Sequence, residues 1–186
     1  SSTSTGSGKF KAPDGTTFET KGKYRKYMYK NYYSFMNKTG ETLCKKPGEV
    51  DGQGFDMKNL KNCVATVCDY SAQSFIDNLD DCKIMCGPVE GSIFVRNCKN
   101  CTFTIACKQL RTRDCVNCVF NLYSQVDPVI ERSTDLTFRP FNGAYPKLRE
   151  HFGKYKLDPN DNHWRLVFDF NPNGKDGYGV PDPHYK

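Results

Sequence analysis

A repeat of 17 to 19 residues runs through the middle of this chain and restricts the folds open to it. Its clearest copies are VRNCKNCTF at residues 95–103 and TRDCVNCVF at 112–120. One column of the repeat holds Cys63, Cys82, Cys101, Cys118 and Leu136, at steps of 19, 19, 17 and 18 residues. A unit this short is too small to bury its own apolar face, so successive units must stack on one another.

The paired cysteines within two of the copies permit two interpretations. Two Cys-x-x-Cys pairs, Cys98 with Cys101 and Cys115 with Cys118, have the spacing of a four-cysteine zinc site. However, Leu136 occupies the column of Cys101 and Cys118, and a leucine can fill the hole of a buried thiol but cannot bind a metal. We therefore favour core positions and predict no metal, with the zinc site as the alternative.

The residues around the column predict strands separated by tight corners. The position before each column member is always Asn or Asp: Asn62, Asp81, Asn100, Asn117 and Asp135. The position two residues after it is apolar: Ala65, Ile84, Phe103, Phe120 and Phe138. Because Asn and Asp tolerate tight turns and alternating apolar residues favour strands, the pattern predicts an all-β parallel β-helix of about five or six coils over residues 50–142.

The composition of the two ends differs from that of the repeat. We expect a disordered or linker tail over 1–20 and a basic, tyrosine-rich extension over 21–45. The β-helix domain with its closing segment should cover 46–170, followed by a loose tail over 171–186. The extensions at both ends of the β-helix are expected to be irregular. The stretch KGKYRKYMYKNYY at 21–33 sets five basic residues among five tyrosines. It can bind nucleic acid or an acidic protein surface, but we favour tyrosines that flank the β-helix and lysines in water. No nucleic-acid motif accompanies it, so we expect no nucleic-acid partner.

Composition also bears on the compartment. No apolar run approaches the ~18 residues that a membrane-spanning helix needs, so we expect no transmembrane segment. Ten cysteines that mostly follow core columns, without a visible signal peptide, favour a reducing, cytoplasmic location. N-terminal lipidation cannot be judged, because the sequence does not begin with Met.

Several runs resemble one known family. CGPVEGSIFVRNC at 86–98, ACKQLRTRDC at 106–115 and DPVIERSTDLTF at 127–138 are similar to the cofactor C-like (tubulin-binding cofactor C, or C-CAP) domain family, in particular its branch that contains the retinitis pigmentosa 2 protein. FNGAYP at 141–146 and NHWRLVFDF at 162–170 resemble its closing motifs. The resemblance implies a right-handed parallel β-helix, which agrees with the repeat.

The resemblance also implies a function. Members of this family stimulate GTP hydrolysis on an Arf-like small GTPase or on tubulin by supplying an arginine finger from a Gln-Gln-Leu/Phe-Arg motif. Here the motif reads Lys108-Gln109-Leu110-Arg111, so Arg111 matches the finger, Gln109 matches the second Gln, and Glu131 matches an acidic residue that contacts the GTPase. The chain itself would need no cofactor, since GTP and Mg²⁺ belong to the partner. The implied location is the cytoskeleton, basal body or cilium.

The repeat places the same residues without the family. Leu110 and Thr112 fall in inward registers, so Arg111 and Arg113 point outward, with Glu131 diagonal to Arg111 at ~7–8 Å. The outward column continues through Phe94 to Phe75. We therefore expect Lys108, Arg113, Phe94 and Phe75 to bind a partner.

Two alternatives stay open. The outward charges can be a solvated ladder of little energetic value. The chain can also be a non-catalytic microtubule- or cilium-associated binding protein that uses the same surface, and Lys108 in place of the family Gln favours this interpretation.

Overall fold

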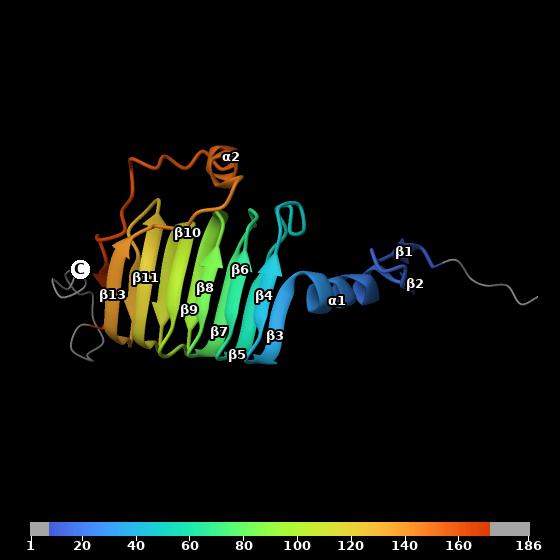
Figure 1. Ribbon diagram of the computed structural model, residues 1–186, viewed down its shortest axis with the longest axis horizontal. Helices are drawn as coiled ribbons and strands as arrows, with labels where there is room; N and C mark the ends of the chain where they lie inside the picture. The colour runs from blue at the N-terminus through green and yellow to red at the C-terminus, as the bar shows by residue number, and fades with distance from the viewer. Residues whose placement is uncertain (1–7, 172–186) are drawn as a thin grey trace, which may run out of the picture.

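The computed structural model describes residues 8–171, and its main body is a parallel β-helix of about six turns (Figure 1). The predicted all-β parallel β-helix is therefore confirmed. Twelve strands form the sheet network: β3 (Ser34–Thr39), β4 (Thr42–Lys45), β5 (Asp56–Lys61), β6 (Val64–Val67), β7 (Ser74–Asp80), β8 (Lys83–Cys86), β9 (Val89–Arg96), β10 (Thr102–Arg113), β11 (Val116–Ser124), β12 (Val129–Glu131), β13 (Thr134–Pro140) and β14 (Phe168–Asp169). All of their pairings are parallel.

The predicted columns are the observed strand registers. Cys118 pairs with Leu136, and Phe120 pairs with both Phe103 and Phe138. The three phenylalanine rings are fully buried and stacked, with centroids 5.1 and 5.2 Å apart. Each coil therefore buries its apolar residues against the same positions of its neighbours, which a single coil could not do.

The Asn and Asp positions form the corners. Two columns adopt left-handed backbone with φ between 45° and 59°: Asn59, Asn78, Asn97, Asp114 and Arg132 in one, and Asn62, Asp81, Asn100, Asn117 and Asp135 in the other. Asn and Asp tolerate this region better than other side chains. The corner amides also bond to one another, as Asn117 Nδ2 donates to Asn100 Oδ1 at 2.8 Å.

The column cysteines lie inside the β-helix. Cys63, Cys82, Cys98, Cys101, Cys115 and Cys118 are all buried and unoxidised. Their thiols donate weak hydrogen bonds to strand carbonyls, for example Cys101 Sγ to Lys99 O at 3.2 Å. Within residues 8–171, no group of three or more His, Cys, Asp or Glu side chains is placed to hold a metal ion. The geometry therefore agrees with cysteines as core residues.

The β-helix begins earlier than the predicted residue 46. β3 pairs with β5 and β4 pairs with β6, so the first coil starts at Ser34. This coil departs from the repeat, because exposed Lys38 stands opposite Leu60 where later coils have apolar residues. The missing core residue explains why the pattern did not extend this far.

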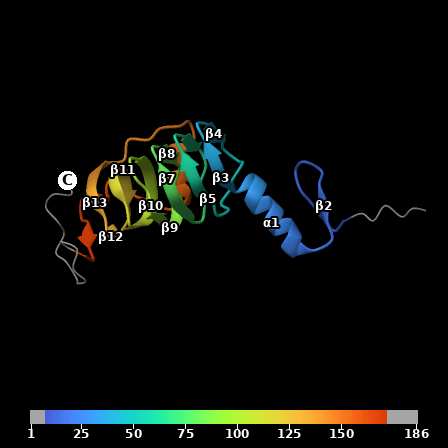
Figure 2. The same ribbon diagram turned by 90° about the horizontal axis from the view of Figure 1, so that it is seen from below.

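The N-terminal extension is ordered rather than irregular. β1 (Phe10–Lys11) and β2 (Thr17–Phe18) form a hairpin within the disordered or linker tail that we predicted over 1–20, while residues 1–7 lie outside the described residues. α1 (Lys21–Tyr32) follows and projects from the end of the β-helix (Figure 2). Met28 is the one buried residue of this helix, so the sequence has no apolar stripe that would predict it.

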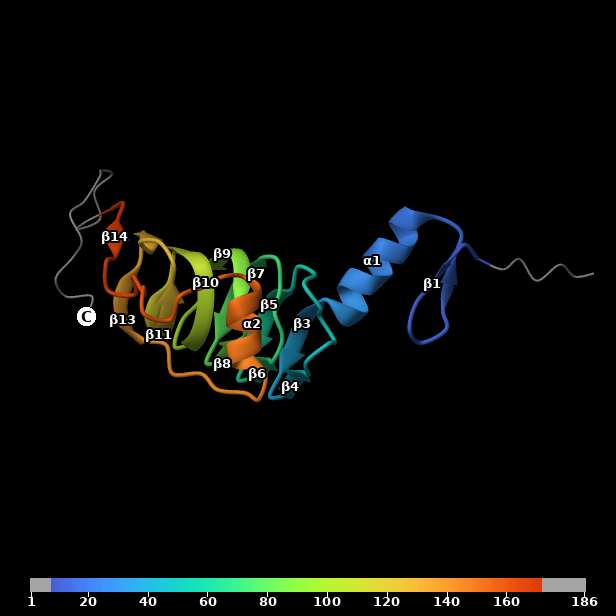
Figure 3. The ribbon, with the colours of Figure 1, turned by 90° about the horizontal axis from the view of Figure 1, so that it is seen from above.

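The closing segment crosses one side of the β-helix and includes α2 (Leu148–Lys154), which lies over the strands (Figure 3). Beneath it His151 Nδ1 is 2.7 Å from Tyr145 Oη, and burial lowers the pKa of His151. α2 departs from the irregular C-terminal extension that we predicted. The loose tail predicted over 171–186 lies, after Asn171, outside the described residues. No helix within residues 8–171 is long and apolar enough to cross a membrane.

Candidate functional site

β10 carries the predicted site across a corner of the β-helix. Its residues 102–107 pair with β11, and the last three, 111–113, pair with β12. The register against β9 shifts between Cys107 and Gln109, which is an irregularity of the kind that re-aims side chains near functional sites. Lys108 lies at this shift and is exposed.

The predicted outward register is confirmed. Leu110 and Thr112 are buried while Arg111 is exposed, so the alternation of the strand aims Arg111 at solvent. Arg111 pairs with Val129 on one side and with Phe94 on the other, and Arg113 pairs with Glu131. The strand thus presents Arg111 between an aromatic and an aliphatic side chain, with Glu131 on the diagonal.

Three arginines stand on this face, and they differ in their partners. Arg96 binds Asp77 through two hydrogen bonds, Nε to Oδ1 at 2.7 Å and Nη2 to Oδ2 at 3.0 Å. Arg113 lies 3.7 Å from the carboxylate of Asp114. Arg111 forms no salt bridge with any residue in the described part of the chain. Of these three arginines, Arg111 is therefore the one without an ionic partner among the described residues, and its donors are available to a partner molecule.

Aromatic rings continue the surface away from Arg111. Phe75 and Phe94 stack with their centroids 4.9 Å apart and their planes at 10°. Both are half-buried, and Arg96 lies over Phe75 at 5.4 Å. A shallow pocket joins Phe94, Arg111, Val129 and Glu131. The structure therefore brings together the predicted residues Arg111, Arg113, Glu131, Phe94 and Phe75.

Two further residues line this pocket that the sequence did not indicate, namely Arg96 and Phe170. Arg96 could have been found, because it stands in the same column as Arg113. Phe170 follows β14, which pairs with β12 outside the repeat, so no periodic signal marked it.

Gln109 lies beside the loop that precedes β12. Its Nε2 donates to the carbonyl of Asp127 at 3.2 Å. The carboxylate of Asp127 in turn accepts a hydrogen bond from His163 Nδ1 at 2.8 Å, and this contact raises the pKa of His163. Gln109 therefore holds the loop that leads into Val129 and Glu131, which is a positioning role.

This geometry can stabilise negative charge on another molecule. A planar guanidinium with free donors can bind two oxygens of a phosphate at once. The half-exposed rings beside it offer apolar area to a protein partner. The site lies on a nearly flat sheet, which suits a macromolecule better than a small substrate.

Comparison with known proteins identifies the family. The model of the tubulin binding cofactor C family matches residues 52–170, so the chain belongs to this family. Tubulin-specific chaperone C of Mus musculus is 28% identical over 137 residues, which cover 74% of this chain and 40% of that protein. Protein XRP2 of Danio rerio is 40% identical over 132 residues, which cover 71% of this chain and 35% of that protein. Protein XRP2 of Homo sapiens is 39% identical over 140 residues, which cover 75% of this chain and 40% of that protein.

These comparisons confirm the resemblance that the sequence motifs indicated. The chain spans about two fifths or less of the length of these relatives.

Proposed function

We propose that this chain is a GTPase-activating protein that supplies Arg111 in trans to an Arf-like small GTPase or to tubulin. The observation that carries the proposal is that Arg111 forms no salt bridge in the described part of the chain, whereas Arg96 and Arg113 on the same face each have a carboxylate partner. Membership of the family and the name of tubulin-specific chaperone C support tubulin as a partner. The Arf-like GTPase is supported by the family motif around Arg111.

The chemistry asks little of the chain beyond this surface. During GTP hydrolysis, negative charge grows on the β–γ bridging oxygen and the γ-phosphate oxygens. Arg111 would stabilise that charge through two parallel N–H donors, and Glu131 would contact the GTPase beside it. GTP, Mg²⁺ and the residue that orients the attacking water would belong to the partner, so the chain needs no cofactor of its own.

A second function is favoured by one residue. Lys108 replaces the family Gln at the exposed corner of β10. If that Gln is needed for hydrolysis, the chain is a non-catalytic binding protein of microtubules or the cilium that uses the same surface. Either function would place the protein in the cytoplasm, at the cytoskeleton, the basal body or the cilium.

Single-turnover GTP hydrolysis on tubulin and a panel of Arf-like GTPases separates the two. We expect Arg111→Ala to lower the stimulated rate by ~10³-fold or more, while binding to the GTP-loaded partner falls much less, because the charge acts mainly in the transition state. Arg111→Lys should rescue poorly, since an ammonium lacks the bidentate fork. Lys108→Gln should give equal or higher activity.

The matched control is Arg113→Ala, which removes an arginine from the same strand and face. Because Arg113 already contacts Asp114, its loss should lower the rate by less than ~10-fold. Equal stimulated rates for wild type and Arg111→Ala, on a partner that demonstrably binds, would leave only the non-catalytic function.

A further inference from the structure

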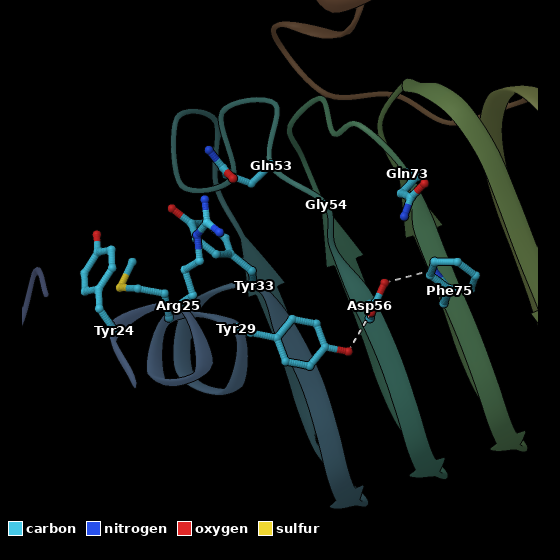
Figure 4. A pocket seen from close by; sticks show the side chains of 10 residues that line it. Tyr24, Arg25, Tyr29, Tyr33, Gln53, Gly54, Asp56, Gln73 and Phe75 are labelled. Atoms are coloured by element: carbon cyan, nitrogen blue, oxygen red, sulfur yellow. Dashed lines mark hydrogen bonds between the residues drawn. The ribbon is translucent and has the colours of Figure 1, made fainter. Parts of the chain in front are cut away.

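A groove separates α1 from the first coils of the β-helix (Figure 4). α1 contributes Arg25, Tyr29 and, at its end, Tyr33, while the facing wall contains Gln53, Gln73 and Phe75. We call this the α1 groove. Its lining offers aromatic rings and amide side chains, which suit the side chains and backbone of an extended peptide.

The acidic residue in the α1 groove is already occupied. Asp56 accepts a hydrogen bond from Tyr29 Oη at 2.5 Å and one from the backbone N–H of Phe75 at 3.0 Å (Figure 4). Burial and the neighbouring Asp56 raise the pKa of Tyr29 above its usual range, so its hydroxyl stays protonated and donates. This contact fixes α1 to β5 and keeps the groove open beside it.

The charge of α1 is uncompensated. Among the cations of the helix are Arg25, Lys26 and Lys30, and the helix contains no acidic residue. None of its cations forms a salt bridge with a residue in the described range 8–171. On the side of α1 away from the groove, Lys26 and Lys30 line a second hollow together with Lys45, and no carboxylate lines it. The exposed cations of α1 and the lysines of this second hollow therefore attract an anionic partner, while the groove itself is lined by both Arg25 and the carboxylate of Asp56.

The α1 groove adjoins the face that carries Arg111. Phe75 lines the groove and also stacks on Phe94, which pairs with Arg111. These three residues stand on consecutive strands of one sheet, so about 10 Å separates Phe75 from Arg111 at ~4.8 Å per strand. A protein that covers Arg111 therefore reaches the groove without rearrangement of either.

We propose that the α1 groove and the cations of α1 form a docking surface for an acidic, extended segment of a protein partner. The amide side chains can hydrogen-bond the backbone of an extended peptide, whereas a lipid surface would need only the charge, so we commit to a peptide. The aromatic rings can also stack on bases, which makes single-stranded nucleic acid the competing outcome of the test. The charge and the lining carry this proposal without the function of Arg111. Only the identity of the partner as the same GTPase rests on the proposed function.

Fluorescence anisotropy with a fluorescein-labelled, glutamate-rich decapeptide that contains two phenylalanines tests the proposal. The full chain should bind this peptide at low salt, and the affinity should fall as salt rises. The triple variant Arg25→Glu, Lys26→Glu, Lys30→Glu should bind ~10-fold more weakly or worse. Phe75→Ala should cost ~3–10-fold through the groove itself.

The control is Lys83→Glu, Arg149→Glu, Arg165→Glu, which changes the net charge equally at exposed sites outside α1 and the groove. It should alter affinity by less than ~2-fold, and circular dichroism should show both triple variants folded. An equal loss in both triple variants would reduce the effect to net charge and overturn the proposal. So would an unchanged affinity in Phe75→Ala, or stronger α1-dependent binding to phosphatidylserine vesicles or single-stranded DNA than to the peptide.

Two further measurements keep this proposal apart from the function of Arg111. Arg111→Ala should bind the peptide as wild type does, whatever its effect on GTP hydrolysis. With an active GTPase partner, the α1 triple variant should raise the concentration needed for half-maximal stimulation and leave the maximal rate unchanged. A lowered maximal rate at saturation would overturn the docking role.

Discussion

The β-helix contains two aromatic stacks, one in its interior and one on its outer surface. Phe103, Phe120 and Phe138 stack inside with ring centroids 5.1 and 5.2 Å apart and have no exposed surface. Phe75 and Phe94 stack outside at 4.9 Å and stay half-exposed. The ring geometry is nearly the same, yet only the inner stack is sealed from water.

The difference shows how one repeat serves two purposes. Parallel in-register pairing places like residues above one another on both sides of the wall. Inside, the column holds the coils together by excluding water. Outside, the column runs from Phe75 and Phe94 to Arg111 and leaves apolar area beside an exposed cation, which favours recognition. The inner stack should therefore govern stability and the outer one binding.

The largest expected effect on stability comes from the inner stack. Phe120→Ala should lower the free energy of unfolding by ~3–5 kcal/mol, because it leaves a cavity between two coils. Chemical denaturation, read by circular dichroism, measures this. An unchanged unfolding midpoint would show that the inner column does not carry the stability.

Phe94→Ala is the matched change in the outer stack. It should cost only about 1 kcal/mol, the value of a half-exposed aromatic pair. A loss as large as that of Phe120→Ala would erase the contrast between the two stacks.

The corners that separate inside from outside should give an intermediate effect. Asn117 has φ of 52°, so Asn117→Ala should cost ~1–2 kcal/mol as its Cβ meets the left-handed backbone. Asn117→Gly also loses the hydrogen bond to Asn100 but removes the strain, so it should cost less. Thermal unfolding measures the stability of both variants. An Ala variant as stable as the Gly variant would contradict the role of the left-handed backbone conformation at this corner.

The smallest expected effect is that of Arg111 on folding. Its side chain is exposed and forms no salt bridge in the described part of the chain, so Arg111→Ala should change stability by less than ~0.5 kcal/mol. Differential scanning calorimetry beside Phe120→Ala gives the comparison. A loss above ~1 kcal/mol would assign Arg111 to the structure instead of to a partner.

The sequence predicted the fold as far as the repeat extends. The columns of Cys101 and Phe120 and the Asn corners are local consequences of stacking, so their spacing revealed both register and side-chain direction. The first coil was not predicted because Lys38 interrupts the apolar column. The helix α1 was not predicted because its contacts to the β-helix depend on single residues such as Tyr29. Neither feature has a period that a pattern could detect.

The candidate site was predictable in part for the same reason. Arg111, Arg113 and Glu131 follow from the register, and Phe94 and Phe75 from its continuation. That Arg111 alone lacks a salt bridge on this face could not be read from the sequence, since the engagement of Arg96 by Asp77 depends on side-chain conformation. The roles of Lys108 and Gln109 stay predictions.

The buried cysteine columns affect whether the unfolded protein can refold. Eight of the ten cysteines are buried and so hidden from oxidants in the native state, and burial raises the pKa of Cys86 to about 12, which keeps that thiol protonated. Unfolding exposes all of them at once, at near-regular intervals along one chain. Random disulfides formed in the unfolded chain would block the stacking of coils, so in air the chain should lose its ability to refold. The lifetime of the native protein would then be set by its unfolding rate.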